Sequence, residues 1–433
     1  MTIVSWEKAA KFLLLVILLV FFAVKGVFPA YAHIDTDFPN YYTAGRIVLS
    51  GTNITRLYDD GWFHERMRQD GVDVPGKFSP NPPSVALLSA PLALFPPLTA
   101  LRILTTLNLM ALSGSVIVLQ TLLRPGYFRT LGFVLLSGMG LANDFRFGQV
   151  YVLISFTIIL GYYLYTKGYP IAAGILFGFW IPIKYFPLAF LPFFFLHREL
   201  RLCAAAILTA GALSLLTVEI MGWDIHRIFL TQVIGSHLVG NLSMQSPFSA
   251  AFQSFDALYR TIFLFDPTLN PSPPIPFAAG FFIAEILTVA IIAGSALTVV
   301  YRLRSIDQHG RYSIGIFAIT ALLLAPATGT YHYVLLWLPL GLILGEREQG
   351  VGNSSTLALL CCYGIIGFAP IAFLRSFSAT GLLIPLAYPR LLALIVLFAL
   401  VIVRACVVVA RHQSHSRTSA SAFVIPTIRG WRA

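Results

Sequence analysis

Charged residues are scarce in this sequence. Asp, Glu, Lys and Arg make up 11% of its 433 residues, whereas 57% are hydrophobic. A soluble domain typically carries about 25% charged residues, so this chain has too few to cover a water-facing surface. Apolar runs of membrane-spanning length recur, for example at 12–23, 283–300 and 391–403 with their flanks. The composition excludes a soluble globular protein and predicts an all-α polytopic membrane protein.

Several functional signatures are also missing. The four cysteines, Cys203, Cys361, Cys362 and Cys406, stand in apolar stretches without metal-type spacing, so they indicate core residues rather than a disulfide frame or a zinc site. There is no Walker loop and no Gly-x-Gly-x-x-Gly between a strand and a helix, which argues against a nucleotide substrate. The net charge of +11 is scattered between apolar runs, so it does not indicate nucleic-acid binding.

The distribution of basic residues predicts a path through the membrane, because Lys and Arg concentrate in short cytoplasmic loops. About twelve crossings with both termini inside place the following on the cytoplasmic side: Lys8, Lys11, Arg124, Arg129, Lys167, Arg198, Arg201, Arg302, Arg304, Arg311, Arg347 and the tail from Arg404 to Arg432. The first apolar run lacks a convincing signal-peptide cleavage site, so we expect it to be an uncleaved helix.

This path defines one transmembrane domain over residues 1–411, followed by a disordered, Ser- and Arg-rich tail at 412–433. Its two large outer loops cover about 31–79 and 221–275, and we expect amphipathic helices in them. A short, proline-bounded apolar segment at 82–95 is expected to be re-entrant or interfacial. The expected helices lie near 9–29, 98–123, 129–143, 149–166, 169–182, 186–197, 202–220, 277–301, 312–327, 332–345, 355–374 and 387–410.

Nearly all unusual polar groups then fall at the outer face. They are Asp35, Asp37, Asn143, Asp144, Arg146, Gln149, Lys184, His237, Gln245 and His332. Ionisable groups at a membrane boundary are costly and usually mark a site. A transporter or flippase, the alternative function, needs polar groups near mid-membrane, and Glu285 is the residue that favours it. The sparse charge elsewhere in the spans favours a one-sided enzyme site.

Two carboxylates, Asp35 and Asp37, begin the first outer loop. Asp37 precedes an expected helix with Tyr41, Ala44 and Val48 on one face, so either carboxylate can be a simple N-cap. The alternative is a general base that deprotonates a sugar hydroxyl during inverting transfer.

The residues after Asp37 carry a family resemblance. Asp37-Phe38-x-x-Tyr41-Tyr42-x-Ala44, Leu49-x-Gly51 and Leu57-Tyr58-Asp59 resemble the first-loop signature of glycosyltransferase family 87. The resemblance continues in order through Phe78-Ser-Pro80-Asn-Pro82-Pro83, Gly148-Gln149, Gly174…Lys184-x-x-Pro187 and Tyr331-His332-Tyr333. It implies a GT-C membrane fold and transfer of a monosaccharide from a polyprenyl-phosphate carrier to a lipid or glycan acceptor. Mannose is the expected sugar. The site would face the outside of the cytoplasmic membrane.

The resemblance also suggests roles for individual residues. It implies Asp37 as the base, with Asp35 as an open alternative, and matches His332 to a histidine of the family's active centre. The expected substrate-binding residues are Asp35, Tyr41, Tyr42, Arg146, Gln149, Lys184, Arg375 and Arg390. Among these, Lys184 and the arginines can bind the carrier phosphate, or else contact lipid headgroups or a neighbouring carboxylate. A carrier with a single phosphate needs less charge neutralisation than a nucleotide donor, so we expect neither a metal nor another cofactor.

Overall fold

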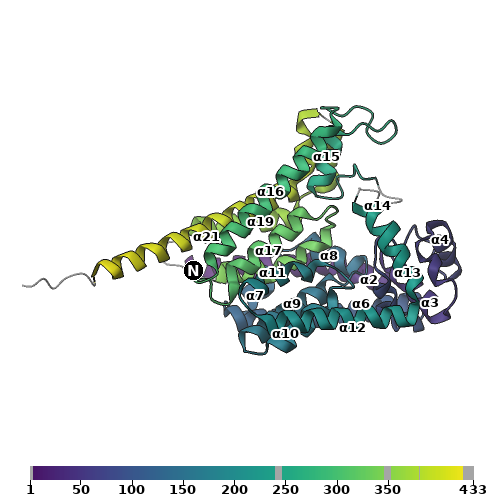
Figure 1. Cartoon of the computed structure of the whole chain (residues 1–433), viewed down its shortest axis with the longest axis horizontal. Helices are drawn as coiled ribbons and strands as arrows, with labels where there is room; N and C mark the ends of the chain where they lie inside the picture. The colour runs from purple at the N-terminus through teal and green to yellow at the C-terminus, as the bar shows by residue number, and fades with distance from the viewer. Residues whose placement is uncertain (1–2, 239–245, 346–352, 380, 423–433) are drawn as a thin grey trace, which may run out of the picture.

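The computed structural model describes residues 3–238, 246–345, 353–379 and 381–422. All regular elements within these ranges are helices (Figure 1). The longest are α1 (Ile3–Phe22), α6 (Pro97–Leu123), α9 (Tyr151–Thr166), α12 (Leu200–Met221), α16 (Ala278–Leu303), α17 (Arg311–Leu324), α19 (Asn353–Phe368) and α21 (Pro389–Ala422). Shorter helices complete the bundle: α2 (Phe28–Ala32), α7 (Tyr127–Leu135), α8 (Met139–Arg146), α10 (Pro170–Trp180), α11 (Leu191–Leu196), α18 (Trp337–Gly345) and α20 (Ile371–Leu374).

Five of the described helices are long and apolar enough to cross a membrane. They are Trp6–Ala32, Pro97–Leu123, Leu200–Met221, Ala278–Leu303 and Pro389–Gln413. Two bent pairs raise the number to seven when each pair is one span: α8 with α9, bent by 117°, and α19 with the following Ile371–Ser378, bent by 76°. Their outward surfaces are rich in exposed Leu, Ile, Phe and Val, as lipid contact requires. The protein is therefore a multi-pass membrane protein.

The expected helices coincide with helical segments of the structure, although those at 186–197 and 332–345 each begin as a 3-10 helix and two others are broken. Predicted single helices at 129–143 and 355–374 are each interrupted, the first at Gly138 and the second at Ala369-Pro370. Gly138 has φ 54°, and a Cβ there would lie 2.5 Å from the carbonyl oxygen of Gly367, so the chain turns where two backbones touch. At the C-terminus, α21 continues to Ala422, beyond the expected start of the disordered tail at His412, and 423–433 lie outside the described residues.

Close packing of α10 on α12 shows how sequence positions the bundle. Gly174 and Gly178 are four residues apart and so share one face of α10. A Cβ on Gly178 would lie 2.3 Å from the carbonyl oxygen of Ala206, and one on Gly174 would lie 2.4 Å from that of Leu202. Small residues at this spacing let two membrane helices approach to backbone contact. The approach fixes the end of α10, from which residues 181–185 continue.

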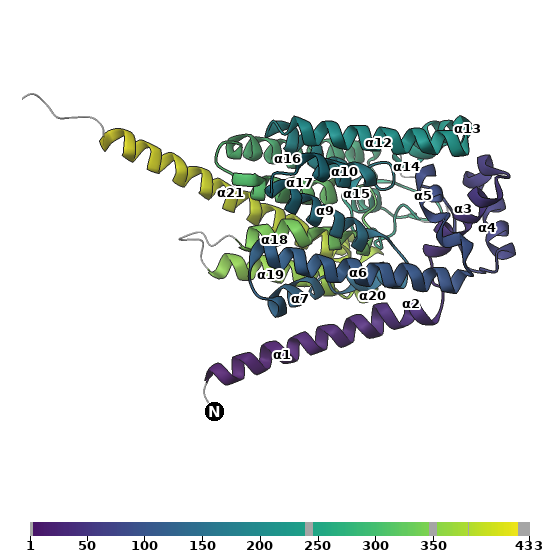
Figure 2. The same ribbon diagram turned by 90° about the horizontal axis from the view of Figure 1, so that it is seen from below.

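The two long segments that the sequence predicts to be outer loops lie mainly at one end of the molecule. The first contains α3 (Phe38–Ser50), η2 (Ile54–Tyr58) and α4 (Asp60–Gln69), and the second contains α13 (Trp223–Ile228), η5 (Phe229–Val233), α14 (Ile234–Leu238) and α15 (Phe255–Phe263). The proline-bounded segment at 82–95 forms α5 (Pro83–Ser89) and η3 (Leu92–Leu94). Figure 2 shows α3, α4 and α13 at the end opposite the N-terminus of α1 and the protruding part of α21. A Cβ on Gly45 of α3 would lie 2.8 Å from the Ser89 carbonyl, so α3 lies directly on α5.

Candidate functional site

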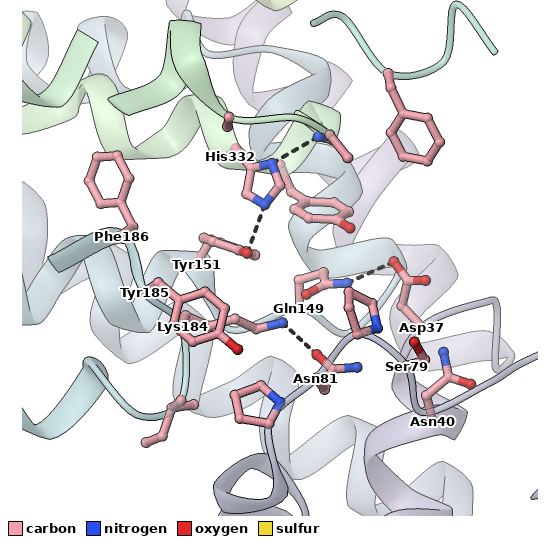
Figure 3. Close-up of a pocket in the computed structure, with 18 of the residues that line it drawn as sticks. Asp37, Asn40, Ser79, Asn81, Gln149, Tyr151, Lys184, Tyr185, Phe186 and His332 are labelled. Atoms are coloured by element: carbon pink, nitrogen blue, oxygen red, sulfur yellow. Dashed lines mark hydrogen bonds between the residues drawn. The ribbon is translucent and has the colours of Figure 1, made fainter. Parts of the chain in front are cut away.

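A cavity of about 660 Å³ lies where the loops meet the helix ends (Figure 3). Its walls come from the turn before α3, the loop before α5, the α8–α9 turn, the segment after α10, and the connection between α17 and η7 (Thr330–Leu336). The polar side chains that line it are Thr36, Asp37, Asn40, Tyr41, Lys77, Ser79, Asn81, Gln149, Tyr151, Lys184, Tyr185, Tyr331 and His332.

Asp37 has an unusual backbone conformation in this cavity. Its φ of 66° and ψ of −58°, with the Phe38 N–H donating to the Thr36 carbonyl at 2.8 Å, define a γ-turn of the rare, strained type. The same N–H also donates to the Phe147 carbonyl at 2.9 Å. Asp37 occupies the N-cap position of α3, yet its side chain makes no capping hydrogen bond. The simple N-cap interpretation is therefore wrong for Asp37.

The α8–α9 turn holds this strained segment in place. Gly148 has φ 63°, and a Cβ there would lie 2.6 Å from the Phe38 Cβ, so only glycine fits. The next residue, Gln149, is held through its backbone, since its N–H donates to the Asp144 carbonyl at 2.8 Å and its carbonyl accepts from Asn108 at 2.9 Å. The turn therefore presents the Gln149 side chain in a fixed direction, toward Asp37.

A chain of hydrogen bonds joins the carboxylate to a lysine. Gln149 donates to the Asp37 carboxylate at 2.7 Å and accepts from the Tyr41 hydroxyl at 2.7 Å. Lys184 donates to the Tyr41 hydroxyl at 3.2 Å and to the Asn81 side-chain oxygen at 2.9 Å. Residues from four separate segments of the chain thus place one anionic and one cationic group on the same cavity.

The cavity shifts the ionisation of both groups, which lie in connections between helices. Burial raises the pKa of Asp37, although the Gln149 hydrogen bond and the Lys184 charge oppose the shift. Burial lowers the pKa of Lys184 to about 8, opposed by the charges of Asp37 and Asp144. A carboxylate with a raised pKa is a better proton acceptor, and a lysine that is still protonated near neutral pH can bind an anion.

Lys184 also borders a second cavity. This smaller space of about 330 Å³ is almost entirely apolar, and it shares Tyr41, Ile183 and Lys184 with the first. Its other lining residues are Phe38, Tyr42, Val85, Leu88, Ser89, Pro91, Leu92, Leu104, Leu107, Val150, Leu153, Phe179 and Trp180. Lys184 therefore lines both the larger cavity, which carries the polar side chains, and the apolar one.

Comparison with known families decides the class of protein. A sequence model described as glycosyltransferase family 87 matches residues 80–326, which is more than half of the chain. The chain belongs to glycosyltransferase family 87. No curated protein was found to match the sequence. The family match contains Gln149 and Lys184, whereas Asp37 and His332 lie outside the matched range.

The remaining residues expected to bind substrate in this glycosyltransferase lie away from the main cavity. Asp35 and Arg146 form an ion pair at 2.6 Å, so Arg146 pairs with Asp35 rather than with its sequence neighbour Asp144. Tyr42 faces the apolar cavity and donates to the Phe95 carbonyl at 2.9 Å. Arg375 is exposed on η8 (Arg375–Ala379). These four side chains do not line the cavity that contains Asp37.

Arg390 is buried behind this glycosyltransferase's cavity instead of lining it. Its guanidinium donates to the Ile366 carbonyl at 2.8 Å and to the Thr330 hydroxyl at 3.0 Å. Thr330 begins η7, so Arg390 braces the turn that carries His332. Glu285, which favoured the transporter alternative, lies on α16 near the Asp256–Arg260 ion pair of α15 and does not line the cavity.

Sequence reasoning missed several cavity residues of the glycosyltransferase. Asn81 lies within the Ser-Pro-Asn-Pro segment that carried part of the resemblance, and Tyr151 follows Gln149 by two residues, so both had a positional signal. Lys77 had none. Within the described residues, no group of three His, Cys, Asp or Glu side chains is arranged to hold a metal ion. The carboxylates of Asp35 and Asp37 have different partners, Arg146 and Gln149.

Proposed function

We propose that this glycosyltransferase takes a monosaccharide, mannose above all, from a polyprenyl-phosphate carrier and transfers it to a hydroxyl of a lipid or glycan acceptor. The observation that carries the proposal is the place of Lys184. Its ammonium group can bind a phosphate, the larger cavity with its polar side chains can hold the sugar next to Asp37, and the apolar cavity suits the start of a hydrocarbon chain. A nucleotide donor has no hydrocarbon chain to occupy the apolar cavity.

The reaction follows from these positions. The acceptor oxygen attacks the anomeric carbon while its proton passes to the Asp37 carboxylate. The bond between that carbon and the phosphate oxygen breaks, and its electron pair stays on the phosphate. Lys184 stabilises the negative charge that grows there, without a metal or other cofactor. Attack from the face opposite the leaving phosphate inverts the anomeric centre.

The end of the molecule that carries α3 and α4 faces the outside of the cytoplasmic membrane, because the basic loops concentrate at the other ends of the helices. The bundle has the GT-C architecture with about twelve crossings, in which the shorter apolar helices add to the five to seven longer spans. The donor, the acceptor and the surrounding membrane lipids are the expected partners.

Purified protein in detergent tests this function. Radiolabelled polyprenyl-phosphate mannose is incubated with the protein and a membrane lipid extract, and the products are separated by chromatography. We expect a new labelled lipid or glycan that depends on the protein. Transfer of label from a nucleotide-mannose alone, with none from the polyprenyl phosphate, would contradict the proposed donor. The double variant K184A/D37N, which lacks both the lysine charge and the carboxylate, is the negative control.

A further inference from the structure

Tyr151, the first residue of α9, lines the cavity, and its hydroxyl lies close to His332 (Figure 3). Its backbone N–H donates to the buried carboxylate of Asp144 at 3.0 Å. The ring of Tyr331 stacks on its ring, with centroids 5.3 Å apart, and the Lys184 ammonium lies 5.6 Å from the same ring centroid. Tyr151 is therefore held by its backbone and by the contacts of its ring with Tyr331 and Lys184. Such support is expected of a group whose position matters for function.

His332 fixes the hydroxyl of this tyrosine. The Gly329 backbone N–H donates to His332 Nδ1 at 2.8 Å, so Nδ1 carries no hydrogen. The hydrogen of the neutral ring is then on Nε2, which lies 2.7 Å from the Tyr151 hydroxyl oxygen and donates to it. A second ring proton would put two N–H groups face to face at Nδ1. The contacts thus select one neutral tautomer of His332.

The direction of this hydrogen bond leaves one group without a partner. Because the Tyr151 oxygen accepts from His332, its own O–H is free to donate elsewhere. No acceptor for this hydrogen is found among the residues that the structure describes. The cavity that the hydroxyl lines is the one that Lys184 enters. An acceptor group bound there would complete the chain from Gly329 through His332 and Tyr151.

We infer that Tyr151 donates this hydrogen bond to the phosphate of the lipid-linked donor, beside Lys184, and that His332 is a positioning residue acting through Tyr151. The inference rests on the proposed function and gives a role to Tyr151, which was not among the site residues expected from the sequence. An O–H aimed at the phosphate stabilises the charge that develops as the glycosidic bond breaks. His332 transfers no proton in this scheme, because its Nδ1 is occupied by Gly329 and its Nε2–H by Tyr151.

Kinetics of four variants test the inference. Tyr151→Phe removes the donor, and we expect kcat/KM for the lipid donor to fall about 10- to 100-fold, as for loss of a hydrogen bond to a charged group. His332→Ala should fall similarly, and the double variant should be no worse than the more impaired single variant. His332→Gln, whose amide can replace Nε2–H, should recover a large part of the rate. If the losses in kcat/KM of the two single variants multiply in the double variant, the inference is overturned. It is also overturned if His332→Gln is as inactive as His332→Ala.

Tyr333→Phe is the matched control. Tyr333 follows His332 on η7, is fully buried, and its hydroxyl has no partner among the described residues. It does not line the cavity. The same chemical change there should leave kcat/KM within about twofold of wild type, because no hydrogen bond is lost. A loss equal to that of Tyr151→Phe would show that removing either hydroxyl merely disturbs packing, and would overturn the inference.

Binding of decaprenyl phosphate without a sugar separates this inference from the proposed function. We expect the wild-type protein to bind it and Tyr151→Phe to bind it at least about fivefold more weakly, measured by calorimetry in detergent. Equal affinities of the two proteins would contradict the role of Tyr151 while leaving the donor class intact. A wild-type protein that neither binds decaprenyl phosphate nor transfers sugar from it would contradict the proposed function, and the inference with it.

Discussion

The side-chain amide of Gln149 donates a 2.7 Å hydrogen bond to the carboxylate of Asp37, although the two residues are 112 positions apart. The bond crosses from the α8–α9 turn to the strained turn before α3. It engages Oδ2 of the carboxylate. Gln149 stabilises the ionised form of Asp37 and so limits the rise of its pKa that burial causes.

Removing this hydrogen bond should therefore raise the pKa of Asp37 further. Gln149→Met keeps the size of the side chain and removes the donor. Because transfer needs ionised Asp37, the acid limb of the pH–kcat/KM profile should move to higher pH, and the rate at low pH should fall more than the rate near neutrality. An unchanged acid limb would show that Asp37 is not the group titrating there.

The wild-type profile should be bell-shaped. On the acid side, activity falls as Asp37 gains a proton at its raised pKa. On the alkaline side, it falls as Lys184 loses its proton near its pKa of about 8. Lys184→Arg keeps the positive charge across this range and should remove the alkaline limb, even if the maximal rate is lower. Persistence of that limb in Lys184→Arg would assign it to another group.

Loss of the lysine charge should appear mainly in donor binding. Lys184→Ala removes the cation between the two cavities, and we expect KM for the lipid donor to rise about 10- to 100-fold, as for a charged hydrogen bond. Lys167→Ala is the matched control, since Lys167 is exposed at the end of α9 and does not line the cavity. Equal KM values for the two variants would show that Lys184 does not bind the donor and only anchors the chain at the membrane interface.

The orientation in the membrane has its own test. Thr52, Ser272 and Arg304 are all exposed in the structure. In a variant without the four native cysteines, cysteines at Thr52 and Ser272 should react with a membrane-impermeant thiol reagent in intact cells, and one at Arg304 should not. The reverse pattern would place the cavity in the cytoplasm and contradict the outer-face site.

The helix positions could be read from the sequence because apolar runs and basic flanks directly reflect the membrane environment. The breaks at Gly138 and Ala369-Pro370 could not, because hydropathy does not change across them and the cause is contact between distant backbones. The family resemblance placed Asp37, Tyr41, Gln149, Lys184 and His332, and the structure brings these five to one cavity.

Other site residues show where sequence reasoning ends. Tyr41 and Tyr42 are adjacent on α3, yet Tyr41 lines both cavities and Tyr42 lines only the apolar one, a difference that their adjacent places in the sequence did not reveal. The partner of Arg146 was not predictable, because Asp35 lies 111 residues away while Asp144 is close in sequence. The hydrogen bond between His332 and Tyr151 spans 181 residues and depends on the packing of η7 beside α9.

The role of Asp37 as general base is the central claim, and Asp37→Asn tests it most directly. Asparagine preserves the shape of the side chain but cannot accept the acceptor's proton. We expect decaprenyl phosphate binding to persist and the rate of transfer from polyprenyl-phosphate mannose to fall by about 10²- to 10⁴-fold. Asp35→Asn, which loses only a partly exposed ion pair, should retain most of the activity. An Asp37→Asn protein that binds the carrier and transfers sugar within about threefold of the wild-type rate would contradict the account.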